Sequence, residues 1–181
     1  MLARSIALPL LVAIVSLSQL ACSRDDDLSE HNQVLVDLSV VIEEKTVAPV
    51  DGISSAGQPS KDALQIFADS GYVAVIDIRG TEENRGFDEV AVIAALEMSY
   101  IAFPISGADA ISFENAAELE ALIGAQGGPV LVHCASGNRV GALLALQRSQ
   151  AGASYLEALQ YGRAAGLKGL QPLVEQMLAA H

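Results

Sequence analysis

The stretch Gly128–Gly141, with the sequence GPVLVHCASGNRVG, constrains the fold of this chain more than any other. Residues 129–132 form a short apolar run typical of a buried strand, and Gly137 permits a sharp turn soon after it. The predicted loop opens a helix. Its N–H groups, the positive end of that helix and the Arg139 guanidinium would all favour a bound anion. We therefore predict an anion-binding loop that consists of Ala135, Ser136, Gly137, Asn138 and Arg139.

Cys134 stands at the point where the predicted strand enters this loop. The same positive field would favour the thiolate over the thiol, which makes Cys134 a candidate nucleophile. The alternative is an inert cysteine buried as a small apolar side chain. A metal site at His133 and Cys134 is not expected, because no second cluster of ligands accompanies the pair. No cofactor is expected either.

The segment His133-Cys134-x-x-Gly137-x-Arg139 resembles the signature loop of cysteine-dependent phosphatases. Upstream, the stretches SAGQPS (55–60) and VAVIDIR (73–79) resemble the bacterial beta-lactamase-hydrolase-like phosphatase domain, a small relative of the dual-specificity phosphatases. The resemblance covers Thr46 to Gln150. It implies a cysteine-phosphatase-like fold in which the Cys134 sulfur attacks phosphorus and forms a cysteinyl-phosphate. It also implies that Arg139 and the loop hold the phosphate oxygens and that His133 orients the loop without acting as a base.

The resemblance further implies a general acid, an aspartate in the loop that follows an earlier strand. Asp109 occupies a loop of that kind, between Pro104 and Ser112. Its alternative role is that of a solvated carboxylate near the start of a helix. Asp77 and Arg79, at the end of another predicted strand, are the next candidates, although an internal ion pair is the preferred interpretation of these two residues.

Two departures from the phosphatase pattern leave other activities open. Four residues separate Cys134 from Arg139 where standard phosphatases have five, and four is the spacing of many rhodanese-type loops. Val140 also stands where phosphatases usually carry a serine or threonine that helps the thiolate leave. We favour hydrolysis of phosphate monoesters. The alternatives are a sulfurtransferase that carries a persulfide on Cys134 and a non-catalytic anion-binding module.

The hydrophobic pattern along the rest of the chain alternates between short strands and amphipathic helices. This alternation predicts a single α/β domain with a mostly parallel central sheet flanked by helices. One or two short strands are expected after Val47, and the segment 34–42 fits a strand or a helix equally well. Further strands are expected at 73–76, 100–103 and 129–132, and helices at 60–70, 87–98, 113–123 and 140–147, then from Ser154 and from Leu170.

The N-terminal residues have the features of an export signal. A positive start at Arg4 precedes an apolar run from Ser5 to Leu20, which is short for a membrane span. We therefore assign residues 1–21 to a signal peptide, 22–45 to a tether with a possible first element, and 46–181 to the phosphatase-like domain. Ala21 before Cys22 fits a lipoprotein cleavage site, and a soluble periplasmic protein is the alternative.

Charge restricts the partners. The formal net charge is −12, and removal of residues 1–21 makes it −13, because this segment holds one basic residue and no acidic one. Such a surface repels nucleic acid and anionic lipid. The expected partners are therefore a phosphorylated small molecule or a phosphoprotein. The membrane is expected to be a partner only through a lipid anchor at Cys22.

The export hypothesis predicts the state of the mature N-terminus. We expect protein recovered from membranes to lack residues 1–21 and to carry lipid on Cys22, which intact-mass spectrometry would show. A Cys22→Ser variant should be released into the soluble fraction. An intact Met1 on cytosolic protein would contradict the assignment.

Overall fold

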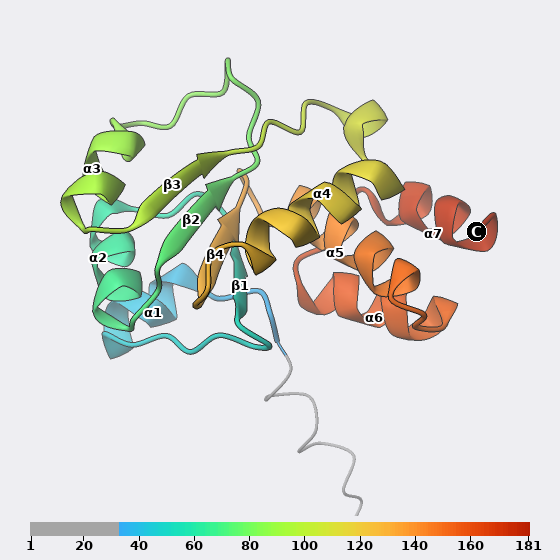
Figure 1. Ribbon diagram of the computed structural model, residues 1–181, viewed down its shortest axis with the longest axis horizontal. Helices are drawn as coiled ribbons and strands as arrows, with labels where there is room; N and C mark the ends of the chain where they lie inside the picture. Colours follow the sequence, from blue (N-terminus) through green and yellow to red (C-terminus); the bar gives the residue numbers. More distant parts are fainter. Residues whose placement is uncertain (1–32) are drawn as a thin grey trace, which may run out of the picture.

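The computed structural model describes residues 33–181 and has a parallel four-stranded sheet at its centre. In spatial order the strands are β1 (Ile53–Ala56), β4 (Val130–His133), β2 (Ala74–Asp77) and β3 (Ser99–Ala102). Helices α1 to α3 lie on one side of the sheet and α4 to α7 on the other (Figure 1). The predicted α/β fold is therefore confirmed. The helices are α1 (Leu38–Glu44), α2 (Lys61–Asp69), α3 (Glu89–Ala95), α4 (Phe113–Gly124), α5 (Asn138–Gln150), α6 (Tyr155–Ala164) and α7 (Gln171–Ala179).

Side-chain caps set the start of most of these helices. The hydroxyl of Ser60 accepts a hydrogen bond from the Ala63 N–H at the start of α2, and Ser112 caps α4 in the same way. At α6, Ser154 and Glu157 form the reciprocal capping box that their spacing predicts. Each of these side chains satisfies N–H groups that the helix itself leaves unpaired.

The two inner strands divide their side chains between two hydrophobic cores. Val130 and Val132 of β4 pack with the core beneath α4 to α7, whereas Leu131 packs with the core beneath α2 and α3. On β2, Ala74 and Ile76 face the first core and Val75 the second. Successive side chains of a strand point to opposite faces, so continuous apolar runs are expected in strands buried on both sides.

The segment before β1 takes part in the fold. Leu35 pairs with Ser55 in a parallel bridge, and Val34 is fully buried in the larger core. The ambiguous stretch 34–42 contains helix α1, whose N-cap is Asp37. Residues 33–45, which the sequence pattern assigned to the tether and a possible first element, thus pack against β1 and α2.

The predicted signal peptide and Cys22 lie outside the described residues. Among residues 33–181, no helix combines the length and the apolar character needed to cross a membrane.

Helix α5 approaches α6 and the turn after it so closely that Gly141 has no room for a side chain. A Cβ at this position would lie 2.2 Å from the Leu167 nitrogen and 2.6 Å from the Gly162 oxygen. Both are backbone atoms, which cannot swing away as a side chain would. The close contact holds the start of α5, and with it the preceding loop, against the C-terminal part of the chain.

We expect Gly141→Ala to lower the free energy of unfolding by about 2–3 kcal/mol, because it overpacks this contact. Urea denaturation followed by circular dichroism would measure the change. Gly124→Ala is the matched control, since a Cβ there meets nothing within 4 Å. The control should leave the stability unchanged or raise it slightly. Equal stability of the two variants would contradict the packing argument.

Candidate active site

The loop after β4 places the Cys134 sulfur at the N-terminus of helix α5. Cys134 is 1% exposed, and its Sγ accepts a hydrogen bond from the Gly137 N–H at 3.1 Å. Gly137 adopts a left-handed conformation with φ of 80°, and a Cβ there would come within 2.7 Å of Leu35 Cδ1. Only glycine fits both requirements, so Gly137 turns the backbone and brings its own N–H to the sulfur.

The remaining N–H groups of the loop are available to a ligand. No residue in the described part of the chain accepts a hydrogen bond from the N–H of Ala135, Ser136, Asn138 or Arg139. Helix α5 has no side-chain cap, in contrast to α1 to α4 and α6. An uncapped helix start of this kind stabilises an anion or a thiolate.

The side chain of Asn138 stabilises the loop from behind. Its Oδ1 accepts hydrogen bonds from the N–H groups of Lys168 and Leu170, at 2.7 and 3.3 Å. The hydroxyl of Ser55 on β1 donates to the Ala165 oxygen at 2.7 Å in the same region. The turn between α6 and α7 therefore supports the loop.

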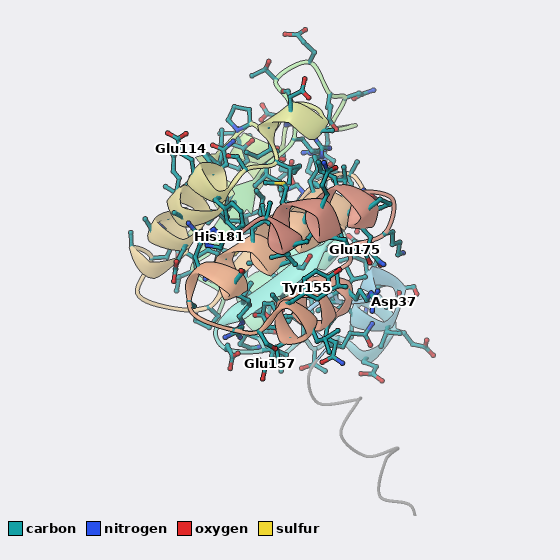
Figure 2. The ribbon with its side chains drawn as sticks, turned by 90° about the vertical axis from the view of Figure 1, so that its right-hand side faces the viewer. Asp37, Glu114, Tyr155, Glu157, Glu175 and His181 are labelled. Atoms are coloured by element: carbon teal, nitrogen blue, oxygen red, sulfur yellow. The ribbon has the colours of Figure 1, made fainter. Side chains whose placement is uncertain are left out.

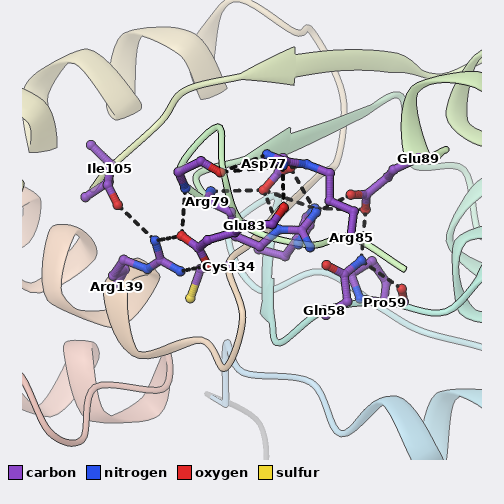
Figure 3. Close-up of polar contacts among 12 residues, drawn as sticks. Gln58, Pro59, Asp77, Arg79, Glu83, Arg85, Glu89, Ile105, Cys134 and Arg139 are labelled. Atoms are coloured by element: carbon purple, nitrogen blue, oxygen red, sulfur yellow. Dashed lines mark hydrogen bonds and ion pairs between the residues drawn. The ribbon is translucent and has the colours of Figure 1, made fainter. Parts of the chain in front are cut away.

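Arg139 is held by a carboxylate that the sequence interpretation did not single out (Figure 3). Its Nη1 and Nη2 donate to the two carboxylate oxygens of Glu83, at 2.5 and 2.7 Å, and Nη1 also donates to the Ile105 oxygen at 2.9 Å. Glu83 accepts a further hydrogen bond from the Gly80 N–H. The only sequence signal was its place in the charged loop after β2, which many surface carboxylates share.

Among residues 33–181, this arrangement leaves one edge of the guanidinium without a carboxylate or carbonyl partner. Arginine has five N–H bonds, of which Glu83 and Ile105 use two on Nη1 and one on Nη2. The remaining donors are Nε–H and the second Nη2–H, which lie side by side and suit two oxygens of one phosphate. Hydrogen bonds from Arg139 hold the pKa of Glu83 below its usual value, so the carboxylate stays ionised and keeps the guanidinium in place.

A buried group of charged residues lies next to the loop, on the α3 side of the sheet. Arg79 contacts both Asp77 and Glu89, and all three are at most 2% exposed. The internal ion pair that was preferred for Asp77 and Arg79 is thus confirmed. The Asp77 carboxylate also accepts hydrogen bonds from Arg85 Nε at 2.8 Å and from the Tyr100 hydroxyl at 3.0 Å.

These hydrogen bonds occupy the acceptor sites of the Asp77 carboxylate, and the two arginines balance its charge. Burial alone would raise the pKa of Asp77, but hydrogen bonds from Arg79 and the nearby positive charge lower it well below the ordinary value. Asp77, Glu89 and His133 have potential ligand atoms within 4.8 Å of one another. A metal ion would have to displace the Arg79 guanidinium that already bridges the two carboxylates.

His133 belongs to this buried group. It is fully buried, with Nε2 3.1 Å from Glu89 Oε1 and 3.9 Å from Asp77 Oδ1. The first distance is short, but its direction is poor, and neither ring nitrogen makes a hydrogen bond with any residue between 33 and 181. Side chains alternate along β4, so His133 points to the α3 side whereas Cys134 points to the α5 side.

Asp109, the predicted general acid, lies in a short 3-10 turn, Ala108–Ala110, and is exposed. No hydrogen bond or ion pair connects its carboxylate to Cys134 or Arg139. The loop that carries Asp109 does reach the site, but through the carbonyl oxygen of Ile105. The structure thus brings together Cys134, the loop N–H groups and Arg139, and it adds Glu83.

We expect Asp77→Asn to destabilise the protein by about 3–5 kcal/mol at pH 7, because the buried Arg79 guanidinium would lose one of the two negative charges that it contacts. A carboxylate whose pKa is lowered by folding stabilises the protein fully above its unfolded pKa, near 3.8. This contribution is lost as the pH falls towards the folded-state pKa. Chemical denaturation at pH 7 and pH 3 should therefore show a smaller difference between variant and wild type at pH 3.

The exposed residue Glu118 on α4 supplies the control, since it forms no ion pair with any other residue of the range 33–181. Glu118→Gln should unfold like the wild type at both pH values. An Asp77→Asn protein as stable as this control at pH 7 would show that the buried ions are not needed.

Comparisons with solved structures show the same fold. A candidate phosphatase of Neisseria meningitidis is 22% identical, with a TM-score of 0.57 over 67% of this chain and 90% of that one. A candidate phosphatase (DUF442) of Shewanella putrefaciens is 18% identical, with a TM-score of 0.53 over 70% and 85%. The core catalytic domain of the PP-IP phosphatase SIW14 of S. cerevisiae is 17% identical, with a TM-score of 0.52 over 68% and 79%.

No curated protein sequence matches the chain at a significant level. The sequence profile of one family does match, and its match spans residues 40–172, from helix α1 into α7. This range contains the Cys134 loop, Glu83 and the buried ion group. The chain therefore belongs to the PTP-NADK family, described as the DSP-PTPase phosphatase fused to NAD+ kinase.

Proposed function

We propose that the protein is a cysteine-dependent hydrolase of phosphate monoesters. The observation that carries the proposal is the free edge of Arg139, which Glu83 fixes beside the unpaired N–H groups of the loop. These donors are of the kind that the three non-bridging oxygens of a phosphoryl group require. Such preorganised electrostatics supply most of the catalysis in phosphoryl transfer.

In the proposed reaction the Cys134 thiolate attacks phosphorus, an S–P bond forms and the ester P–O bond breaks. The departing alkoxide takes a proton and leaves as the alcohol. Water then attacks the cysteinyl-phosphate, the S–P bond breaks, and inorganic phosphate leaves as the thiolate is restored. Asp109 is the proposed proton donor, because its loop also contacts Arg139 through Ile105.

The position of Val140 supports a slow second step. Val140 is fully buried in the core beneath α5 and carries no hydroxyl to stabilise the departing thiolate. Breakdown of the cysteinyl-phosphate is therefore expected to limit the rate. The proposed substrates are phosphorylated small molecules or phosphoproteins, and the name of the yeast neighbour, a PP-IP phosphatase, adds PP-IP compounds to the classes to be tried. We also propose that the protein acts after export, as its N-terminal sequence indicates.

We expect purified protein to hydrolyse an aryl phosphate and not to transfer sulfur from thiosulfate to cyanide. Cys134→Ser should abolish turnover, because the nucleophile is lost. Arg139→Lys should lower kcat by about 10²–10³, because a point charge cannot reproduce a two-pronged contact. Glu83→Gln should also lower kcat, since the guanidinium loses the charged partner that orients it. Phosphate release and thiocyanate formation can be measured on one preparation, with Glu118→Gln as a fully active control.

Other outcomes would separate the three functions. Thiocyanate formation that exceeds phosphate release would favour a sulfurtransferase. No detectable activity in either assay, with phosphate still protecting Cys134 from iodoacetamide, would favour an anion-binding module. Full activity of Cys134→Ser would remove Cys134 from the mechanism altogether.

A further inference from the structure

A pocket of about 340 Å³ lies beside the anion loop, and Ser136 of the loop and Gly57 line it. Gly57 and Ser136 are also paired in an antiparallel bridge, so this wall of the pocket is continuous with the phosphate cradle. The opposite wall comes from the start of the folded chain, where Leu35, Val36 and Leu38 supply apolar surface and Asp37 lies at the outer edge. Figure 2 shows Asp37 at the periphery of the molecule, next to α1.

This wall is a fixed part of the structure. The Leu35 N–H donates to the Ala164 oxygen at 2.8 Å, and the Val36 N–H donates to the Ser55 oxygen at 2.9 Å. Leu35 also packs against Gly137, the turning point of the anion loop. These contacts join residues 35 and 36 to β1, to the end of α6 and to the loop that follows Cys134.

The charge at the pocket is negative. None of the residues that line it is basic, and Asp37 is the one charged residue among them. The Asp37 side chain accepts hydrogen bonds from the Ser39 N–H and hydroxyl, at 2.9 and 2.5 Å, and these bonds lower its pKa. Its carboxylate thus stays ionised. It also occupies the free N–H at the start of α1, where an anion would otherwise be attracted.

The arginines near the loop do not offset this negative charge. Arg79 and Arg85 are paired with Asp77 and Glu89, and Arg139 is paired with Glu83. Residues 135–138 of the loop are uncharged. The residues that line the adjoining pocket therefore offer no positive charge to a second phosphoryl group, and the exposed Lys168, whose N–H is bonded to Asn138, is not among them.

We propose that this pocket binds the organic part of the substrate and that this part is neutral or cationic, with apolar surface next to the ester oxygen. The proposal rests on the proposed phosphatase function and narrows its substrates. It disfavours polyphosphorylated compounds, whose further phosphates would face Asp37. A monophosphate that carries an aromatic or alkyl group and an amine fits the apolar wall and the acidic edge together.

The test compares two phenyl phosphates that differ only in the charge at the end of the same two-carbon arm. One is O-phosphotyramine, which has an ammonium group, and the other is O-phosphorylated 3-(4-hydroxyphenyl)propanoate, which has a carboxylate. We expect kcat/KM of wild-type protein to favour the ammonium ester about two- to fivefold, the range of a solvent-exposed ion pair. Asp37→Lys should reverse the preference, and Glu44→Lys at the far end of α1 should not.

A binding measurement separates this proposal from the proposed function. Cys134→Ser protein should bind both esters without turnover, and calorimetry should show the same preference for the ammonium ester. If wild-type protein hydrolyses neither ester but the binding preference is present, the pocket assignment stands and the phosphatase proposal fails. If hydrolysis occurs but both esters bind equally and Asp37→Lys changes nothing, the pocket assignment is overturned.

A second variant is needed because Asp37→Lys also removes the N-cap of α1. Ser39 also lines the pocket, and Ser39→Phe should fill it. This variant should bind the ammonium ester at least fivefold more weakly, about 1 kcal/mol. Protection of Cys134 by inorganic phosphate should be unchanged, because phosphate alone does not enter the pocket. An equal effect on ester and phosphate would show that the pocket is not separate from the cradle.

Discussion

The alternation of side chains along β4 is the constraint on which the site depends. This strand lies between β1 and β2 and is buried on both faces, so its side chains divide strictly between the two cores. Two adjacent residues, His133 and Cys134, therefore enter different environments. His133 joins the ions beneath α3, and Cys134 joins the uncapped start of α5. A shift of one residue in the pairing of β4 would exchange the two positions and remove the thiol from its loop.

The buried ions are best understood as an orienting device. A group such as Asp77, Arg79 and Glu89 contributes little net stability compared with an apolar core of the same volume. Each charged side chain nevertheless fixes the orientation of the side chains that it contacts. Asp77 lies opposite His133 in the register of the sheet. The ends of β2 and β4 are thereby held together at the edge where the anion loop begins. Glu83 orients Arg139 at the candidate active site in the same way, outside the buried group.

Much of this structure could be predicted from local sequence. The strand at 130–133, the loop and the helix after it follow from an apolar run, a glycine and an arginine at defined spacing. The start of α6 follows from Ser154 and Glu157. The ambiguity at residues 34–42 could not be resolved locally, because the helix there is stabilised by tertiary contacts with α2. Glu83 could not be identified for a related reason. Its role depends on a partner 56 residues away, and nothing in its immediate sequence distinguishes it from Glu82.

The contacts made by Asn138 have a consequence for the order in which the protein matures. Its side chain is held by Lys168 and Leu170, while Leu35, near the start of the described residues, is held by Ala164. A chain still emerging from the ribosome has residues 134–139 long before it has these supports. The hydrogen bonds that support the anion loop are therefore complete only when synthesis has passed Leu170. Until then the supports behind the loop are incomplete, and the contact between the Gly137 N–H and the Cys134 sulfur is not yet held in place.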